Sequence, residues 1–304
     1  MRICSLLPSA TEIAFALGLG DSVVGVTHEC DYPTEAKQRE VVVKSAIDPH
    51  HIDSGTIDKI VTGHLKAKKS LYTIDLARFK ETNPDLILTQ GLCDVCALDY
   101  QEVSEAAKTL ARRPNIISLT PGTLTDVLKD IARVGQATGT PREAAALVDQ
   151  LSARIQHVRE QASRSALRPR VACVEWLDPI YCAGHWVPEM VGLVGGIDGL
   201  GKMGQPSQKI DWSQMIEYGP EIMVLMPCGF NVERTLREID LLYRLPDWKD
   251  LPAVKEGKLF AVNGHAYFSR SGPRLIEGLE ILAQIVHPES FPWKAAPDAA
   301  RKLN

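Results

Sequence analysis

Short apolar runs alternate with amphipathic stretches along most of this 304-residue chain. The runs are rich in Val, Ile and Leu and are bounded by Pro, Gly or Asp, which is typical of buried strands. We predict strands at residues 2–7, 22–27, 85–90 and 115–120, and again at 170–176, 222–226 and 258–262. Helical patterns lie between them, for example at residues 11–19 and 188–193. This alternation predicts mostly parallel sheets covered by helices.

The helix expected at residues 11–19 has a start signal. Ser9 is a suitable N-cap, and Glu12 three residues later completes a capping box.

The two halves of the chain contain similar sequence segments. Asn83-Pro84-Asp85 precedes one predicted strand, and Gly219-Pro220-Glu221 precedes another. Between the halves, residues 141–165 keep an apolar stripe at helical spacing, with Pro141 in the first turn. We therefore predict an α/β fold of two Rossmann-like lobes, at 1–120 and 166–304, joined through 121–165 by a long connecting helix. A rigid helical connection permits only a small rocking motion of the lobes.

Composition narrows the class of protein. Hydrophobic residues make up 45%, charged residues 24%, and the formal net charge is −4. No basic stretch resembles a nucleic-acid footprint, so we expect no nucleic-acid partner. The chain begins with a predicted strand instead of a secretory signal, so a cytoplasmic location is expected, or a periplasmic one if a signal was removed.

The seven cysteines form an odd set without disulfide-scaffold spacing, and Cys4, Cys173 and Cys182 lie in apolar runs typical of buried thiols.

Several short motifs follow one another in a characteristic order. They are Ser5-Leu6-Leu7-Pro8-Ser9-Ala10-Thr11-Glu12, Gly25-Val26-Thr27, Asp31-Tyr32-Pro33, Asn83-Pro84-Asp85-Leu86-Ile87-Leu88, Gly195-Gly196 and Ser269-Arg270-Ser271-Gly272-Pro273-Arg274. On these motifs the chain resembles the helix-linked class of ABC-importer substrate-binding proteins. The resemblance is closest to the vitamin-B12-binding (cobalamin-binding) proteins, and it covers nearly the whole chain.

The resemblance implies a ligand cleft between the lobes, at the ends of the sheet strands, and no enzymatic activity. Its expected ligand is cobalamin, a related corrinoid or another small-molecule metal chelate, bound by a monomer. A corrin is a flat apolar macrocycle fringed with amides, which suits aromatic faces and a few hydrogen-bond donors. The implied ligand-binding residues are Pro8, Ser9, Asp31, Tyr32, Gly91, Trp176, His185, Trp186, Trp212, Tyr267 and Arg270. Among the tryptophans, Trp186 is the strongest candidate, because it follows His185 in a Gly-bounded turn.

Two features depart from the family pattern. The family's transporter-docking glutamates correspond here to Ser213, followed by Gln214, and to the region 99–102. An ABC-importer permease therefore stays a possible partner, with a cytoplasmic carrier, sensor or scavenger as the alternative use. Residues 47–71 exceed the usual connection and could form a lid or an insertion loop.

One element is not required by the family pattern. Cys93 and Cys96 form a Cys-x-x-Cys pair directly after a predicted strand, and His28 and Cys30 follow another strand of the same lobe. Thiolates and imidazole at this spacing suit zinc or an iron-sulfur cluster. Convergence requires the two strands to be adjacent or nearly so. The alternatives are a cytoplasmic metal-binding or iron-sulfur protein, a redox disulfide, inert thiols lining the cleft, or a thiol hydrolase using Cys93 with His28 as its base.

Overall fold

The computed structural model describes residues 1–49, 51–67, 69–91 and 100–303. They divide into two compact units. Unit 1 comprises Met1–Ile52, Lys59–Pro121 and Thr125–Gln150, and unit 2 comprises Asp53–Asp58, Gly122–Leu124 and Leu151–Asn304. Each unit has a mixed sheet with a parallel centre and helices, which confirms the predicted fold class.

Unit 1 contains a six-stranded sheet in the order β4-β3-β2-β1-β5-β6. All neighbouring strands are parallel except β3 and β4. The strands are β1 (Ile3–Ser5), β2 (Val23–Thr27), β3 (Glu40–Ser45), β4 (Tyr72–Ile74), β5 (Leu86–Gln90) and β6 (Asn115–Leu119). The helices along this part of the sequence are α1 (Pro8–Ala16), α2 (Ser54–Lys66), α3 (Leu76–Thr82), α4 (Tyr100–Ala107) and α5 (Leu124–Thr138), with short 3₁₀ turns η1 (Gly20–Ser22) and η2 (Thr34–Gln38).

Unit 2 contains a second six-stranded sheet, in the order β12-β11-β10-β7-β8-β9. Its centre, β11-β10-β7, is parallel, and the outer strands run antiparallel to their neighbours. The strands are β7 (Val171–Trp176), β8 (Tyr181–Cys182), β9 (Gln208–Lys209), β10 (Ile222–Leu225), β11 (Leu259–Val262) and β12 (Ala300–Leu303). The helices are α7 (Val187–Leu193), α8 (Trp212–Tyr218), α9 (Val232–Leu236), α10 (Asp240–Tyr243), α11 (Pro252–Lys255), α12 (Gly264–Tyr267) and α13 (Leu275–Val286), with the 3₁₀ turn η3 (Trp248–Asp250).

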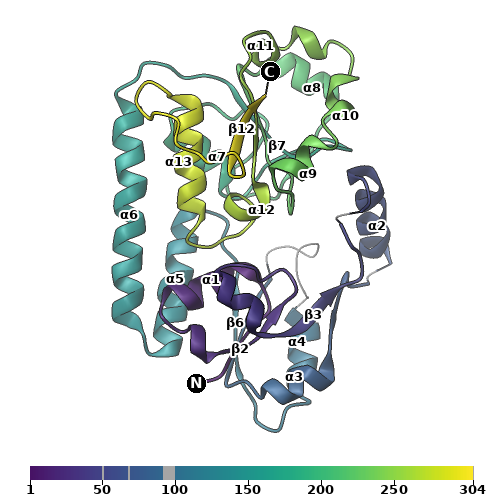
Figure 1. The fold of residues 1–304 in the computed structure, drawn as a ribbon, viewed down its shortest axis with the longest axis vertical. Helices are drawn as coiled ribbons and strands as arrows, with labels where there is room; N and C mark the ends of the chain where they lie inside the picture. Colours follow the sequence, from purple (N-terminus) through teal and green to yellow (C-terminus); the bar gives the residue numbers. More distant parts are fainter. Residues whose placement is uncertain (50, 68, 92–99, 304) are drawn as a thin grey trace. The chain divides into compact units, whose positions relative to one another are not determined.

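The predicted long helix forms as α6 (Pro141–Ser163), one uninterrupted element (Figure 1). Its residues up to 150 belong to unit 1 and those from 151 onward to unit 2. The Arg154 guanidinium donates to both carboxylate oxygens of Glu280 on α13, at 2.8 and 2.7 Å. This two-point ion pair fixes the rotation of α6 against its neighbour in unit 2.

The echo between the two halves has a structural basis. In each unit, a left-handed residue ends a helix and a Pro-acid pair then leads into a central strand, with Asn83 at φ 38° in one unit and Gly219 at φ 56° in the other. The Asp85 carboxylate accepts the backbone N–H of Arg2 at 2.8 Å, and the Glu221 carboxylate accepts that of Arg170 at 3.0 Å. A similar local sequence therefore makes the same kind of hydrogen bond at the start of a parallel strand pair in both units.

The start of α1 differs from the prediction. The helix begins at Pro8, which occupies its first turn, and the N-cap Leu7 makes no side-chain cap bond. Ser9 and Glu12 lie inside the helix and are buried, so the predicted capping box is wrong. Proline at the first helical position is favoured because its missing N–H has no intrahelical partner there.

The core of each unit is apolar. Cys4, Cys173 and Cys182 are buried, as their apolar sequence context predicted. Among the described residues, no helix is both long enough and apolar enough to cross a bilayer.

Candidate functional site

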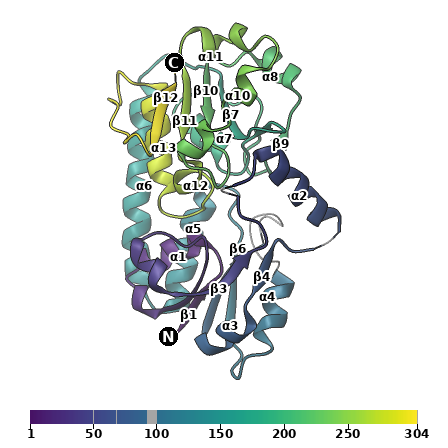
Figure 2. The ribbon, with the colours of Figure 1, turned by 45° about the vertical axis from the view of Figure 1, so that its right-hand side comes forward.

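The carboxyl edge of the second sheet brings predicted ligand residues together. Strands β7, β10 and β11 are parallel neighbours, so the loops that follow them lie at the same edge (Figure 2). Trp176 ends β7, and its ring centroid lies 5.1 Å from that of Phe230, in the loop after β10. The Phe230 carbonyl accepts the backbone N–H of His265, which follows β11, at 3.1 Å. A continuous row of ring and polar groups therefore crosses three strands.

Arg270 and His265 extend this row. Arg270 is only 6% exposed, and its guanidinium donates to the His265 ring. Tyr267, on the same short helix as His265, is half-buried, and the Arg274 guanidinium carbon lies 5.8 Å from its ring centroid. Tyr267 and Arg270 thus both lie at the predicted edge.

The structure ranks the other two tryptophans differently from the sequence. Trp186 is 5% exposed, and its indole N–H donates to the Phe268 carbonyl at 2.8 Å, so it is a core residue. Trp212 begins α8 and stacks on Trp248, with centroids 6.0 Å apart. Its indole N–H donates to the Pro246 carbonyl at 2.7 Å. Both side chains are already committed to packing, which leaves Trp176 as the tryptophan at the edge.

His185 lies just before α7. It is half-buried and has a φ of 52°, an uncommon conformation for a residue with a side chain. Burial lowers the pKa of His185 below its ordinary value, because desolvation disfavours the imidazolium. Its ring centroid is 5.6 Å from that of Trp186. The His185 ring therefore packs beside a core residue.

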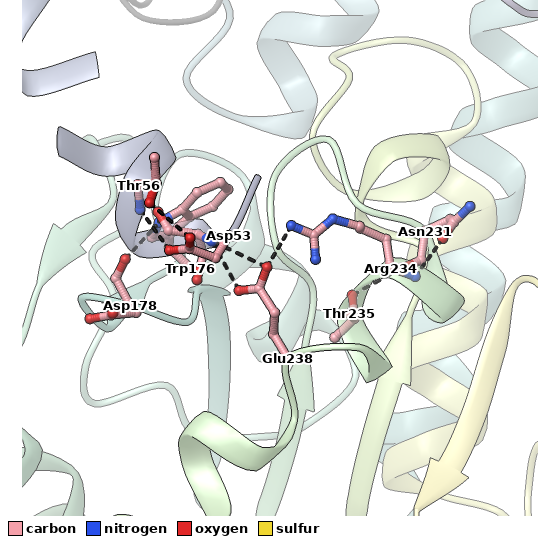
Figure 3. Close-up of polar contacts among 9 residues, drawn as sticks. Asp53, Thr56, Trp176, Asp178, Asn231, Arg234, Thr235 and Glu238 are labelled. Atoms are coloured by element: carbon pink, nitrogen blue, oxygen red, sulfur yellow. Dashed lines mark hydrogen bonds and ion pairs between the residues drawn. The ribbon is translucent and has the colours of Figure 1, made fainter. Parts of the chain in front are cut away.

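Sequence reasoning missed a polar cluster at the same edge, drawn in Figure 3. Glu238 and Arg234 are 9% and 8% exposed and form an ion pair of 2.5 Å. Both Glu238 carboxylate oxygens accept the backbone N–H of Ser54, at 3.1 and 3.0 Å. The Trp176 indole N–H donates to the Ser54 carbonyl at 3.2 Å. The i,i+4 spacing of Arg234 and Glu238 was the only signal of this cluster in the sequence, and it is common on exposed helices.

The carboxyl edge of the first sheet carries the other predicted ligand residues. Strands β2, β1 and β5 are parallel neighbours, and the segments with Pro8, Ser9, Asp31, Tyr32 and Gly91 follow their carboxyl ends. Tyr32 is 46% exposed, whereas Ser9 is buried within α1. Gly91 directly follows β5 and is exposed. The topology therefore places all five near one edge of the unit 1 sheet.

The predicted metal ligands lie in different environments. Cys30 is 3% exposed, and its sulfur accepts the Thr11 hydroxyl at 3.1 Å. His28 is exposed, and its ring Nδ1 lies 3.2 Å from the Val43 carbonyl oxygen. Cys93 and Cys96 lie outside the described residues. Strand β1 separates β2 from β5, so the two strand ends are two intervals apart, about 9.6 Å. Within the described part of the chain, no three His, Cys, Asp or Glu side chains form a group that could hold a metal.

Comparisons with known proteins agree with the architecture. The periplasmic binding protein family model matches residues 3–265. An ABC transporter substrate-binding lipoprotein of Bacillus subtilis is 26% identical, over 95% of this chain and 81% of its own length. A vitamin B12-binding protein of Vibrio cholerae is 24% identical, over 92% of this chain and 86% of its own. The solved periplasmic heme-binding protein of Pseudomonas aeruginosa superposes with a TM-score of 0.73 and 17% identity, covering 98% of this chain and 96% of that one.

Proposed function

This chain belongs to the periplasmic binding protein family, and we propose that it binds cobalamin or a related corrinoid as a non-catalytic substrate-binding protein. The observation that carries the proposal is the row formed by Trp176, Phe230, His265 and Arg270 at the carboxyl edge of the second sheet. Aromatic faces with a few fixed polar groups suit a flat macrocycle with polar substituents.

Two kinds of relative support different metal chelates. The Vibrio cholerae relative is a vitamin B12-binding protein, and it aligns with most of this chain. The Pseudomonas aeruginosa structure is a heme-binding protein, and its likeness concerns the fold alone. We favour the corrinoid because the B12-binding relative is 24% identical to this chain, whereas the heme-binding structure is 17% identical.

The proposed partner is the permease of an ABC importer. The family's docking glutamate on the second lobe is replaced here by Ser213, followed by Gln214. Gln214 instead takes part in a capping box with Asp211 at the start of α8. A permease that accepts this chain would therefore need a different contact at this position.

Visible-light titration tests the ligand. Purified protein is titrated with dicyanocobinamide, cyanocobalamin and haemin, and we expect saturable spectral shifts with a corrinoid. The Trp176→Phe variant should bind the corrinoid more weakly, whereas Trp186→Phe, in the core, should bind as the wild type does. No saturable shift with either corrinoid at tens of micromolar would refute the proposal, and a shift with haemin alone would replace the corrinoid by haem.

A further inference from the structure

We propose that the Glu238 carboxylate and the Trp176 indole N–H form a carboxamide-binding subsite in unit 2, occupied in this structure by the backbone of Ser54. The inference rests on the proposed function and specifies the chemistry of the ligand substituent that this edge recognises.

The occupant shows the recognition pattern. Ser54 offers its N–H to the Glu238 carboxylate, at 3.0 and 3.1 Å, and its carbonyl to the Trp176 indole N–H, at 3.2 Å (Figure 3). These two backbone groups belong to successive peptide units, yet together they present one donor and one acceptor. A primary carboxamide carries the same donor and acceptor in one group. The subsite supplies their complements, an anionic acceptor and a neutral donor.

The subsite is built before any ligand arrives. Glu238 is nine-tenths buried, and its charge is balanced by the equally buried Arg234 at 2.5 Å. The Arg234 guanidinium carbon lies 4.2 Å from the Phe230 ring centroid, and Trp176 packs against the same ring at 5.1 Å. Phe230 therefore positions both the acceptor side and the donor side of the subsite, which limits the ordering cost of binding.

When Ser54 is displaced, each of its two partners keeps another polar contact. The Trp176 indole N–H also lies 3.1 Å from the Asp178 carbonyl oxygen, and Glu238 keeps its ion pair with Arg234. Ser54 also fits imperfectly, because its buried hydroxyl has no hydrogen-bond partner among the residues that the structure describes. A buried unsatisfied hydroxyl costs about 1–3 kcal/mol. A ligand amide without that hydroxyl can displace Ser54.

The carboxylate acceptor of the subsite selects against ligand carboxylates. A ligand carboxylate would face Glu238 as a like charge and would offer it no N–H. Asp53 directly precedes Ser54 in the sequence, and Figure 3 shows Asp178 beside Trp176 in the same cluster. A corrinoid carries carboxamides around its ring and haem carries propionates, so this subsite favours corrinoids over haem.

Substitutions at Ser54 test the competition in both directions. Ser54 is the first residue of α2, where proline is accommodated, and the Asp53 carboxylate still accepts the Thr56 N–H at 2.8 Å. Ser54→Pro removes the N–H that binds Glu238, so we expect dicyanocobinamide to bind about tenfold more tightly. Ser54→Ala keeps both backbone groups and removes the unsatisfied hydroxyl, so we expect about threefold weaker binding.

Two isosteric fragments test the subsite without a corrinoid. In Ser54→Pro protein labelled with ¹⁵N, acetamide and acetate are titrated while the Trp176 indole resonance, assigned with Trp176→Phe, is followed. Acetamide should shift this resonance saturably and acetate should not. Equal shifts, or no shift with acetamide, would overturn the subsite whatever the corrinoid results. An acetamide shift in a protein that binds no corrinoid would uphold the subsite and refute the proposed function.

Two corrinoids, one with amides and one with carboxylates, test whether the subsite recognises the amides of the ligand. Dicyanocobyrinic acid has the ring of dicyanocobinamide with carboxylates in place of the amides. We expect wild-type protein to bind the amide form at least about tenfold more tightly, and Glu238→Gln, whose amide can donate to a carboxylate, to reduce this ratio. An unchanged ratio in Glu238→Gln would overturn the assignment of Glu238 as the selecting group.

Discussion

Replacing Trp186 by phenylalanine separates core packing from ligand contact. The side chain is 5% exposed, and its indole N–H donates to the buried Phe268 at 2.8 Å. Phenylalanine keeps an aromatic ring of smaller volume and removes the N–H. The Phe268 carbonyl then loses this partner, and the space of the second ring is left unfilled.

The two losses give an expected magnitude. Depriving a buried carbonyl of its donor costs about 1–3 kcal/mol. A residual cavity of roughly 40 Å³ costs about 1 kcal/mol at about 24 cal/mol per Å³. We therefore expect Trp186→Phe to lower the free energy of unfolding by roughly 2–4 kcal/mol.

Urea unfolding, followed by circular dichroism, measures this loss, and titration with dicyanocobinamide measures affinity on the same protein. Trp176→Phe is the matched control, because Trp176 is half-buried and lies at the sheet edge. Trp186→Phe should lower the free energy of unfolding and leave affinity within about twofold of the wild type. Trp176→Phe should weaken binding and leave the free energy of unfolding nearly unchanged. The reasoning fails if Trp186→Phe costs less than about 0.5 kcal/mol and weakens binding tenfold.

Three further predictions concern other parts of the chain. Because the pKa of His185 is lowered on folding, its stabilising contribution is present above pH 6.5 and is lost as the pH falls through the lowered value. Asparagine tolerates the left-handed backbone at this position, so thermal melting in acid should show a smaller loss of stability for His185→Asn than for the wild type. Gly184→Ala would place a methyl group against the Gln205 carbonyl oxygen and should cost more than about 2 kcal/mol in urea unfolding, whereas Gly192→Ala, in open space within α7, should be neutral or stabilising. If the Cys-x-x-Cys pair holds a metal, elemental analysis should find a stoichiometric metal that Cys93→Ser/Cys96→Ser loses; equal substoichiometric metal in both proteins would refute this prediction.

Local sequence signals predicted seven of the strands, but they did not predict β3, an inner strand of the first sheet. The strands that became β1, β2, β5, β6, β7, β10 and β11 are all marked by β-branched and aliphatic runs between turn residues. Helix α6 formed as the apolar stripe indicated, because an amphipathic pattern of that length has few alternative structures. The two-residue strands β8 and β9 carry too few positions for any periodicity, and they form because β8 pairs with β7 and β9 pairs with β8.

The placement of single side chains was less predictable. Trp186 has a Gly-bounded polar setting that suggests a binding turn, yet the partner that buries it is Phe268, 82 residues away in sequence. The Cys30 context is turn-like, yet its sulfur packs against the Thr11 hydroxyl. Burial depends on which segments fold over a residue, and nearest neighbours in sequence do not specify that.

Local sequence was enough to predict the α/β class, the repeated halves, the long helix and the strand ends that carry the predicted ligand residues, because each depends on periodicity or on local backbone chemistry. Tertiary structure alone decided the row from Trp176 to Arg270 and the capture of Ser54 by Glu238. Ser54 and Glu238 are separated by 184 residues, and their contact needs α2 to begin beside the loops that follow β7 and β10. Such a contact depends on the order of strands in a sheet, which the chain fixes only when all of its apolar faces are buried together.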